Sequence, residues 1–172
     1  MRIKPMFWFA IVAALAMSCN EEDDGERVAP ITLYEKIDGN WALMSLKMTD
    51  EVAKANGVQP FDQNLSTQFN YEDFAIRFNV DDKNRPTTYE VSGDVPPLFA
   101  PSGYYKLSSD FQTTSGAAVR IYLYSDAGLT TKTDELRLTS VPGSNGEMEL
   151  QLVRTSGGVP FASYTFRLNS VN

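Results

Sequence analysis

From about residue 31 onward, apolar and polar residues alternate in short segments, which is the pattern of β-strands that bury one face. Gly, Pro, Asn and Asp separate these segments, and long helical periodicity is missing. The predicted strands are residues 40–48, 73–80, 87–92, 103–108, 117–124, 133–140, 147–154 and 161–169. Because the alternate residues are mostly polar, we expect a sheet with one dry face and one wet face.

The connections between the predicted strands are mostly typical of hairpins. The short ones, rich in Asp, Asn, Gly and Pro, are residues 81–86, 142–146 and 156–158. Only short helices fit the rest of the pattern. Asp50 can cap a helix over residues 51–55, which Gly57 would end, and a turn of helix near 31–37 also fits.

Eight sequential antiparallel strands with one dry face have to hide both their edges and their apolar side chains. An all-β, eight-stranded antiparallel up-and-down barrel over residues 31–172 does both, and a two-sheet sandwich is the alternative. The first strand breaks the alternation, because Trp41 and Leu43 lie on one face whereas Met44 and Leu46 lie on the other. This predicts either a bulge or a strand buried on both faces.

Composition excludes several classes of function. The chain has 172 residues, a net charge of −7, no His and a single Cys. Catalysis and zinc binding that need imidazole are therefore excluded, as is an internal disulfide. The acidic charge makes nucleic acid an unsuitable partner.

Motifs of enzymes and metal sites are also missing. Asp81 and Asp82 are typical of a turn, and Glu147 with Glu149 is typical of a solvated strand face. We find no nucleophile elbow, phosphate-binding loop or S-x-x-K motif. The sequence therefore predicts a protein that is not an enzyme, with no catalytic residue, metal or cofactor.

The N-terminus has the pattern of a lipoprotein leader. Arg2 and Lys4 precede an apolar run over 5–17, which is shorter than the roughly 20 residues that span a bilayer core. Residues 1–18 are therefore predicted to be a signal peptide. The stretch that ends at Cys19 resembles a bacterial lipobox, with Ala16 where Leu is usual, and this implies a lipid anchor on Cys19.

Residues 19–30 are predicted to be a flexible tether, because five acidic residues within 21–26 repel one another. Such an acidic cluster resembles the export signal of lipoproteins in some Gram-negative gut anaerobes. It implies a lipid-anchored protein of the outer membrane that faces the cell exterior, with the periplasmic face as the alternative.

Gly39-Asn40-Trp41 at the start of the first strand resembles the G-x-W signature of the lipocalin superfamily. Residues 31–172 are similar to the lipocalin-like domains of unknown function that these anaerobes carry in lipoproteins. Lipocalins often place a late basic residue across that Trp. Arg167 is the candidate, although the alternation puts it on the face opposite Phe166 and Leu168.

The two longest connections, 49–72 and 93–102, fall at the same end of an up-and-down barrel, where long loops commonly carry binding. The predicted ligand-binding residues at this mouth are Phe61, Phe69, Tyr71, Leu98, Phe99 and Tyr104. An eight-stranded barrel either fills with side chains or holds one small ligand, and the sequence leaves both open.

Two functions follow from these alternatives. The first is a surface-anchored barrel that binds a small amphipathic molecule or a sugar at its mouth. The second is an interaction module with a filled barrel, whose loops bind another protein of the cell envelope.

Overall fold

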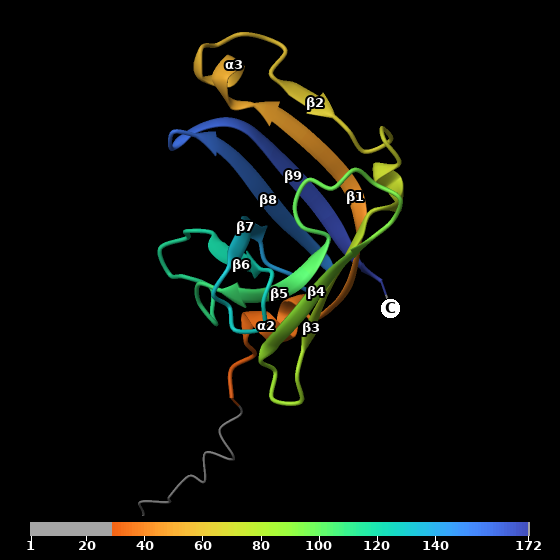
Figure 1. Ribbon diagram of the computed structural model, residues 1–172, viewed down its shortest axis with the longest axis vertical. Helices are drawn as coiled ribbons and strands as arrows, with labels where there is room; N and C mark the ends of the chain where they lie inside the picture. The colour runs from red at the N-terminus through yellow and green to blue at the C-terminus, as the bar shows by residue number, and fades with distance from the viewer. Residues whose placement is uncertain (1–28, 172) are drawn as a thin grey trace, which may run out of the picture. The chain divides into compact units, whose positions relative to one another are not determined.

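The computed structural model describes residues 29–171 (Figure 1). The predicted signal peptide, Cys19 and most of the predicted tether lie outside the described residues. The helices are α2 (Leu33–Ile37), α3 (Glu51–Ala55) and the 3₁₀ turn η1 (Tyr71–Asp73). The strands are β1 (Gly39–Asp50), β2 (Asp62–Asn64), β3 (Ala75–Val80), β4 (Pro86–Ser92), β5 (Ser102–Leu107), β6 (Val119–Tyr124), β7 (Lys132–Ser140), β8 (Glu147–Ser156) and β9 (Val159–Val171).

Eight of the strands form a closed antiparallel barrel. β1 pairs with β3, each strand from β3 to β8 pairs with the next, and β9 pairs back with β1. The prediction of an all-β up-and-down barrel with short helices is confirmed. The sequence pattern did not predict the one additional strand, β2. It pairs with the upper part of β1, and its three polar, exposed residues carry no alternation that a sequence could show.

The irregularity predicted in the first strand is a bulge. The β1–β9 register shifts between Leu43 and Ser45, and this moves the inward set of residues by one position. Trp41 and Leu46 are consequently both buried, although they lie five positions apart, whereas Met44 points outward. The bulge therefore allows both halves of β1 to face the same core.

The barrel interior is rich in aromatic side chains. The ring centroid of Phe166 lies 5.2 Å from that of Phe74 and 6.1 Å from that of Phe99. Lower in the barrel, the ring of Phe78 lies 5.0 Å from that of Tyr105. Alternate residues of β6, β7 and β8 supply Val, Ile, Leu and Met to the same core. These side chains fill the interior.

The lower end of the barrel, where β1 begins, is covered by α2 (Figure 1). A capping box between Thr32 and Glu35 starts this helix. The backbone N–H of Leu33 donates to the carbonyl of Asp110 over 2.8 Å, in the loop between β5 and β6. The amide of Asn84, in the β3–β4 turn, donates to Glu35 over 2.8 Å. The helix is thus bound to two loops of this end.

Trp41 is held by α2 and not by a basic residue. Its indole N–H donates to the carbonyl of Ile37 over 2.8 Å, and the side chain is buried. Arg167 lies on the outer face of β9, where its guanidinium is 3.4 Å from the carboxylate of Glu147. The expectation that Arg167 packs across Trp41 is wrong. The alternation of β9 places Phe166 and Leu168 inside, so the residue between them must point outward.

No helix within residues 29–171 has both the length and the apolar character needed to cross a membrane.

Four tyrosines of the core have raised pKa values. Burial raises the pKa of Tyr89 to about 12 and also raises those of Tyr34, Tyr71 and Tyr105. The Tyr105 hydroxyl is buried and has no hydrogen-bond partner among the described residues. The hydroxyl of Tyr89, in contrast, donates to the carbonyl of Ala100 over 2.9 Å.

These shifts predict a loss of stability at alkaline pH. Tyrosines of the unfolded chain lose their protons near pH 10, whereas Tyr89 keeps its proton to about pH 12. The unfolded state then binds fewer protons than the native state, so the free energy of unfolding falls as pH rises from about 10 to about 12. Urea unfolding at a series of pH values measures this slope.

The variants Y105F and Y89F separate burial from hydrogen bonding. Y105F should leave the neutral-pH stability unchanged or raised, because no hydrogen bond of the described residues is lost, and it should flatten the alkaline slope. Y89F should flatten the slope as well, but it should lose about 0.5–1.5 kcal/mol at neutral pH with its hydrogen bond. An unaltered slope in both variants would contradict the explanation.

Candidate functional site: an apolar groove at the upper end of the barrel

Two long loops meet at the upper end of the barrel, opposite α2. One runs from α3 through β2 and η1 to β3, and the other, residues 93–101, joins β4 to β5. The hydroxyl of Tyr71 in η1 donates to the carbonyl of Pro96 over 3.1 Å. The two connections that the sequence assigned to one end are therefore in direct contact.

Side chains from other elements hold the loop 93–101 at every second carbonyl. The donor and acceptor residues are Asn70 with Asp94, Tyr71 with Pro96, Arg154 with Leu98, and Tyr89 with Ala100. Arg154 is itself oriented by Asp134, whose carboxylate lies 2.7 Å from the guanidinium. A loop with three prolines that is fixed at this spacing forms a wall whose shape is set before any ligand arrives.

Gly93 begins this loop in a conformation that other residues rarely adopt, with a φ of +103°. A Cβ atom at this position would lie 2.4 Å from the carbonyl oxygen of Asp73. The absence of a side chain lets the loop 93–101 pack directly on the backbone that follows η1. Gly93 therefore sets the distance between the two loops.

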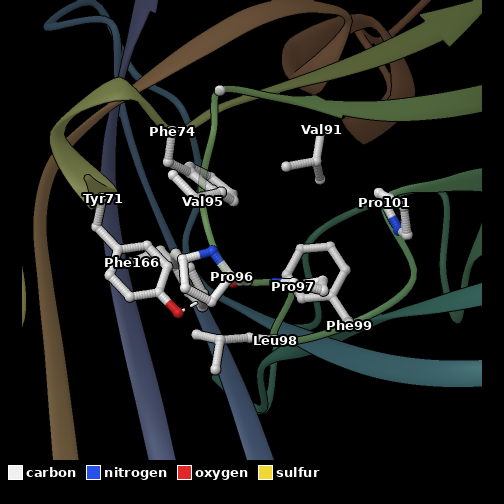
Figure 2. Close-up of a pocket in the computed structure, with 11 residues that line it drawn as sticks. Tyr71, Phe74, Val91, Val95, Pro96, Pro97, Leu98, Phe99, Pro101 and Phe166 are labelled. Atoms are coloured by element: carbon white, nitrogen blue, oxygen red, sulfur yellow. Dashed lines mark hydrogen bonds between the residues drawn. The ribbon is translucent and has the colours of Figure 1, made fainter. Parts of the chain in front are cut away.

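An apolar groove of about 330 Å³ lies between the two loops. Its lining residues are Met48, Gln63, Leu65, Phe69, Tyr71, Pro96, Leu98 and Tyr164. A smaller pocket of about 50 Å³ adjoins it and shares Tyr71, Pro96 and Leu98. Figure 2 shows this smaller pocket, with the rings of Phe74, Phe99 and Phe166 among the side chains around it.

No charged side chain of residues 29–171 lines the groove. Its polar groups are the amide of Gln63 and the hydroxyls of Tyr71 and Tyr164, and that of Tyr71 already donates to Pro96. Burying a charge in such a site without a partner is costly, whereas burying apolar surface is favourable. The arrangement therefore suits a neutral, mostly apolar molecule with one or two polar groups.

Phe69 projects from the groove in an unusual backbone conformation. Its side chain is 64% exposed, and both Phe69 and Asn70 have positive φ values, of 56° and 60°. For Phe69 the left-handed region costs roughly 1–2 kcal/mol, whereas Asn adopts it more readily. The ring of Phe69 is 6.4 Å from that of Tyr71 and nearly perpendicular to it. Strain that keeps an aromatic ring in solvent is typical of a binding site.

The structure brings together four of the six predicted mouth residues. Phe69, Tyr71 and Leu98 line the groove, and Phe99 lines the smaller pocket with the latter two. Phe61 is half-buried just before β2 and lines neither. Tyr104 lies on the outer face of β5, since its neighbour Tyr105 points inward. These two residues are not part of the groove.

Sequence reasoning missed five residues of the groove, which are Met48, Gln63, Leu65, Pro96 and Tyr164. Met48 and Tyr164 are cross-strand partners near the upper ends of β1 and β9. Their proximity follows from barrel closure and from the register of β1 with β9, and the break in alternation that marks the bulge does not show which residue of β9 lies opposite Met48. Pro96 lies in a predicted mouth loop, and loop residues give no sign of the direction in which they point.

Across residues 29–171, acidic, Cys and His side chains form no group of three that could hold a metal ion.

A protein-family model matches most of the chain. The model of a family described as "Domain of unknown function (DUF5004)" matches residues 16–169. No curated protein matches the chain.

The role of Gly93 is testable by substitution. G93A should destabilise the fold by about 2 kcal/mol or more, because left-handed strain adds to the clash with Asp73. G157A is the matched control, since Gly157 also has a positive φ but has open space around its Cβ position. Urea unfolding measures both variants. Equal losses in the two variants would mean that the packing of the loops does not depend on Gly93.

Proposed function

The chain belongs to the DUF5004 family of domains of unknown function, and we propose that it is a lipid-anchored, lipocalin-like binding protein of the cell envelope. Its groove holds a small amphipathic molecule, and its role is binding without catalysis. The observation that carries this proposal is an apolar groove, free of charged side chains, between loops that hydrogen bonds fix in place.

The filled interior directs binding to the rim. Phe99 is buried against Phe166 and Tyr89, so the loop 93–101 closes the barrel from above. An apolar ligand chain then has the groove and its 50 Å³ side pocket available to it. The hydroxyl of Tyr164 and the amide of Gln63 are suited to orient a polar end group.

The closed barrel supports the lipocalin-like part of the proposal. Gly39-Asn40-Trp41 opens β1, and the indole is buried beside the helix that covers the lower end. The G-x-W resemblance leads us to expect a tryptophan at the start of the first strand, which is where Trp41 lies. Arg167 does not contact Trp41, and in this respect the domain departs from the lipocalin pattern.

The direction of the chain supports an outward-facing groove. Residues 31–38 enter the domain at the lower end through α2, and the groove lies at the upper end. An anchor on Cys19, followed by the acidic tether 19–30, would hold the domain by that lower end. Two or more acyl chains give a stable anchor where one is marginal. The groove would then open away from the outer membrane, towards the cell exterior.

A second candidate is an interaction module that binds another envelope protein. The exposed ring of Phe69 and the aromatic filling of the barrel favour it, because a small apolar surface on a rigid domain also suits a protein partner. The binding protein would take up a free small molecule in the groove, whereas the interaction module would need a protein partner to cover it.

A homologous series of n-alkanols from hexanol to decanol tests the first candidate. The protein is residues 19–172 with C19S, so that it stays unacylated, and binding is measured by titration calorimetry. Each methylene that enters the groove contributes about 0.8 kcal/mol, so the affinity should rise about fourfold per carbon until the groove is full. Absence of binding at every length would reject the small-molecule function and favour the interaction module.

Two exposed phenylalanines at opposite ends of the barrel provide a matched pair of variants. F69A should weaken alkanol binding and leave the stability nearly unchanged, because Phe69 is 64% exposed and lies in the groove. F111A removes an exposed ring in the loop between β5 and β6, at the lower end, and should leave binding unchanged. Equal weakening by both variants would place the binding outside the groove.

A further inference from the structure

A second concavity lies next to the loop 93–101, and its lining differs in chemistry from that of the groove. It has a volume of about 410 Å³, and we refer to it as the polar hollow. Its lining residues are Thr88, Tyr89, Glu90, Ser102, Gly103, Tyr104 and Ser125. We propose that the polar hollow is a binding site for a neutral oligosaccharide. This site is separate from the groove and does not rest on the function proposed for it.

The strands β4 and β5 form the floor of the polar hollow. Thr88 pairs with Tyr104, and Glu90 pairs with Ser102. These four residues alternate with Tyr89 and Tyr105, which are buried, so their side chains lie on the outer face of the barrel. The floor is therefore a rigid two-stranded surface that carries one phenol ring, two aliphatic hydroxyls and one carboxylate.

The side of the polar hollow opens because β5 and β6 part above Tyr104. Their ladder begins at the pair of Tyr104 and Tyr124. Above it, Ser125 begins the loop between β6 and β7 and lines the far side of the hollow. Gly103 lies in between, and a Cβ atom there would be 2.3 Å from the carbonyl oxygen of Tyr124. A residue without a side chain is thus required at this point.

The polar side chains of the hollow are available to a ligand. Among residues 29–171, the side chains of Glu90, Ser102 and Tyr104 have no hydrogen-bond or ion-pair partner. Thr88 accepts a hydrogen bond from the amide of Asn79 over 3.0 Å, which leaves its own hydroxyl hydrogen free to donate. Serine and threonine hydroxyls can donate and accept, and a carboxylate accepts only. A sugar ring presents many hydroxyls that match this mixture.

The ring of Tyr104 supplies the second requirement of saccharide binding. It is partly buried on the outer face of β5, where Thr88 and Tyr124 flank it as cross-strand partners. A pyranose has a face of C–H groups that packs on an aromatic ring, while its hydroxyls point to the sides. A ring that is held by neighbours loses little side-chain entropy when a sugar packs on it.

The charge of the polar hollow selects among saccharides. Among residues 29–171, Glu90 is the one Asp, Glu, Lys or Arg residue that lines it. An anionic sugar would meet a carboxylate without a compensating cation, so sulfated and uronic-acid oligosaccharides are disfavoured. The chemistry therefore points to a neutral oligosaccharide, with Tyr104 as the stacking platform and Glu90 as acceptor for sugar hydroxyls.

The test uses residues 19–172 with C19S and four neutral hexasaccharides: maltohexaose, cellohexaose, xylohexaose and mannohexaose. An oligogalacturonate is the anionic comparison, and binding is measured by titration calorimetry and by NMR chemical-shift mapping. At least one neutral hexasaccharide should bind and shift the signals of residues 88–90 and 102–104. The proposal is overturned if none of them binds, or if the oligogalacturonate binds as tightly as the best neutral one.

Outward-facing tyrosines on neighbouring strands give a matched pair of variants. Y104A should weaken saccharide binding about tenfold, or about 1.4 kcal/mol, because the sugar loses an aromatic packing contact. Y122A is the control, because Tyr122 also lies on the outer face, on β6, but does not line the polar hollow. Y104F, which keeps the ring, should bind nearly as well as the parent, and urea unfolding of Y104A shows whether its loss of binding is a folding defect. Equal affinity of Y104A and Y122A would overturn the proposal.

The same variants separate this proposal from that for the groove. F69A should leave saccharide binding unchanged, and Y104A should leave alkanol binding unchanged. Loss of saccharide binding in F69A would place the sugar in the groove and would overturn the assignment to the polar hollow. Failure of alkanols to bind, with saccharide binding intact, would reject the function proposed for the groove alone.

Discussion

The pairing of β1 with β9 closes the barrel, and the other features of the structure depend on it. This ladder runs from Asn40 opposite Val171 to Asp50 opposite Ala162. β1 also has to pair with β3 below and with β2 above, and the bulge between Leu43 and Ser45 lets both of its halves keep their apolar residues inside. Without that shift, either Trp41 or Leu46 would face solvent.

A filled interior explains why neither candidate site lies inside the barrel. Phe74, Phe99 and Phe166 occupy the space that a ligand would need within the barrel. The same loop that carries Phe99 into the core also bounds the groove. Four donor residues from three other parts of the chain hold its alternate carbonyls, so core packing and site geometry are coupled. A change in this loop would therefore affect stability and binding together.

Alternation along the chain was sufficient to predict the eight barrel strands, and the need to hide strand edges favoured a closed barrel over a two-sheet sandwich. Asp50 likewise predicted α3, because its carboxylate accepts from the backbone N–H groups of Val52 and Ala53. Both signals are local, since they depend on residues a few positions apart. The strand β2 gave no such signal, because its residues are polar and exposed, and it forms only because the upper part of β1 offers an unpaired edge.

The sequence by itself determined the period of the strands, the hairpin turns and the end of the barrel at which the long loops meet, because these follow from local chemistry and from chain direction. Only the tertiary structure decided that Phe69, Tyr71 and Leu98 line one apolar groove while Tyr104 lies in a polar hollow on the outer face. Which side a loop residue faces depends on register, on the bulge in β1 and on the anchoring of the loop 93–101. Each of these arises from contacts between residues far apart in the chain.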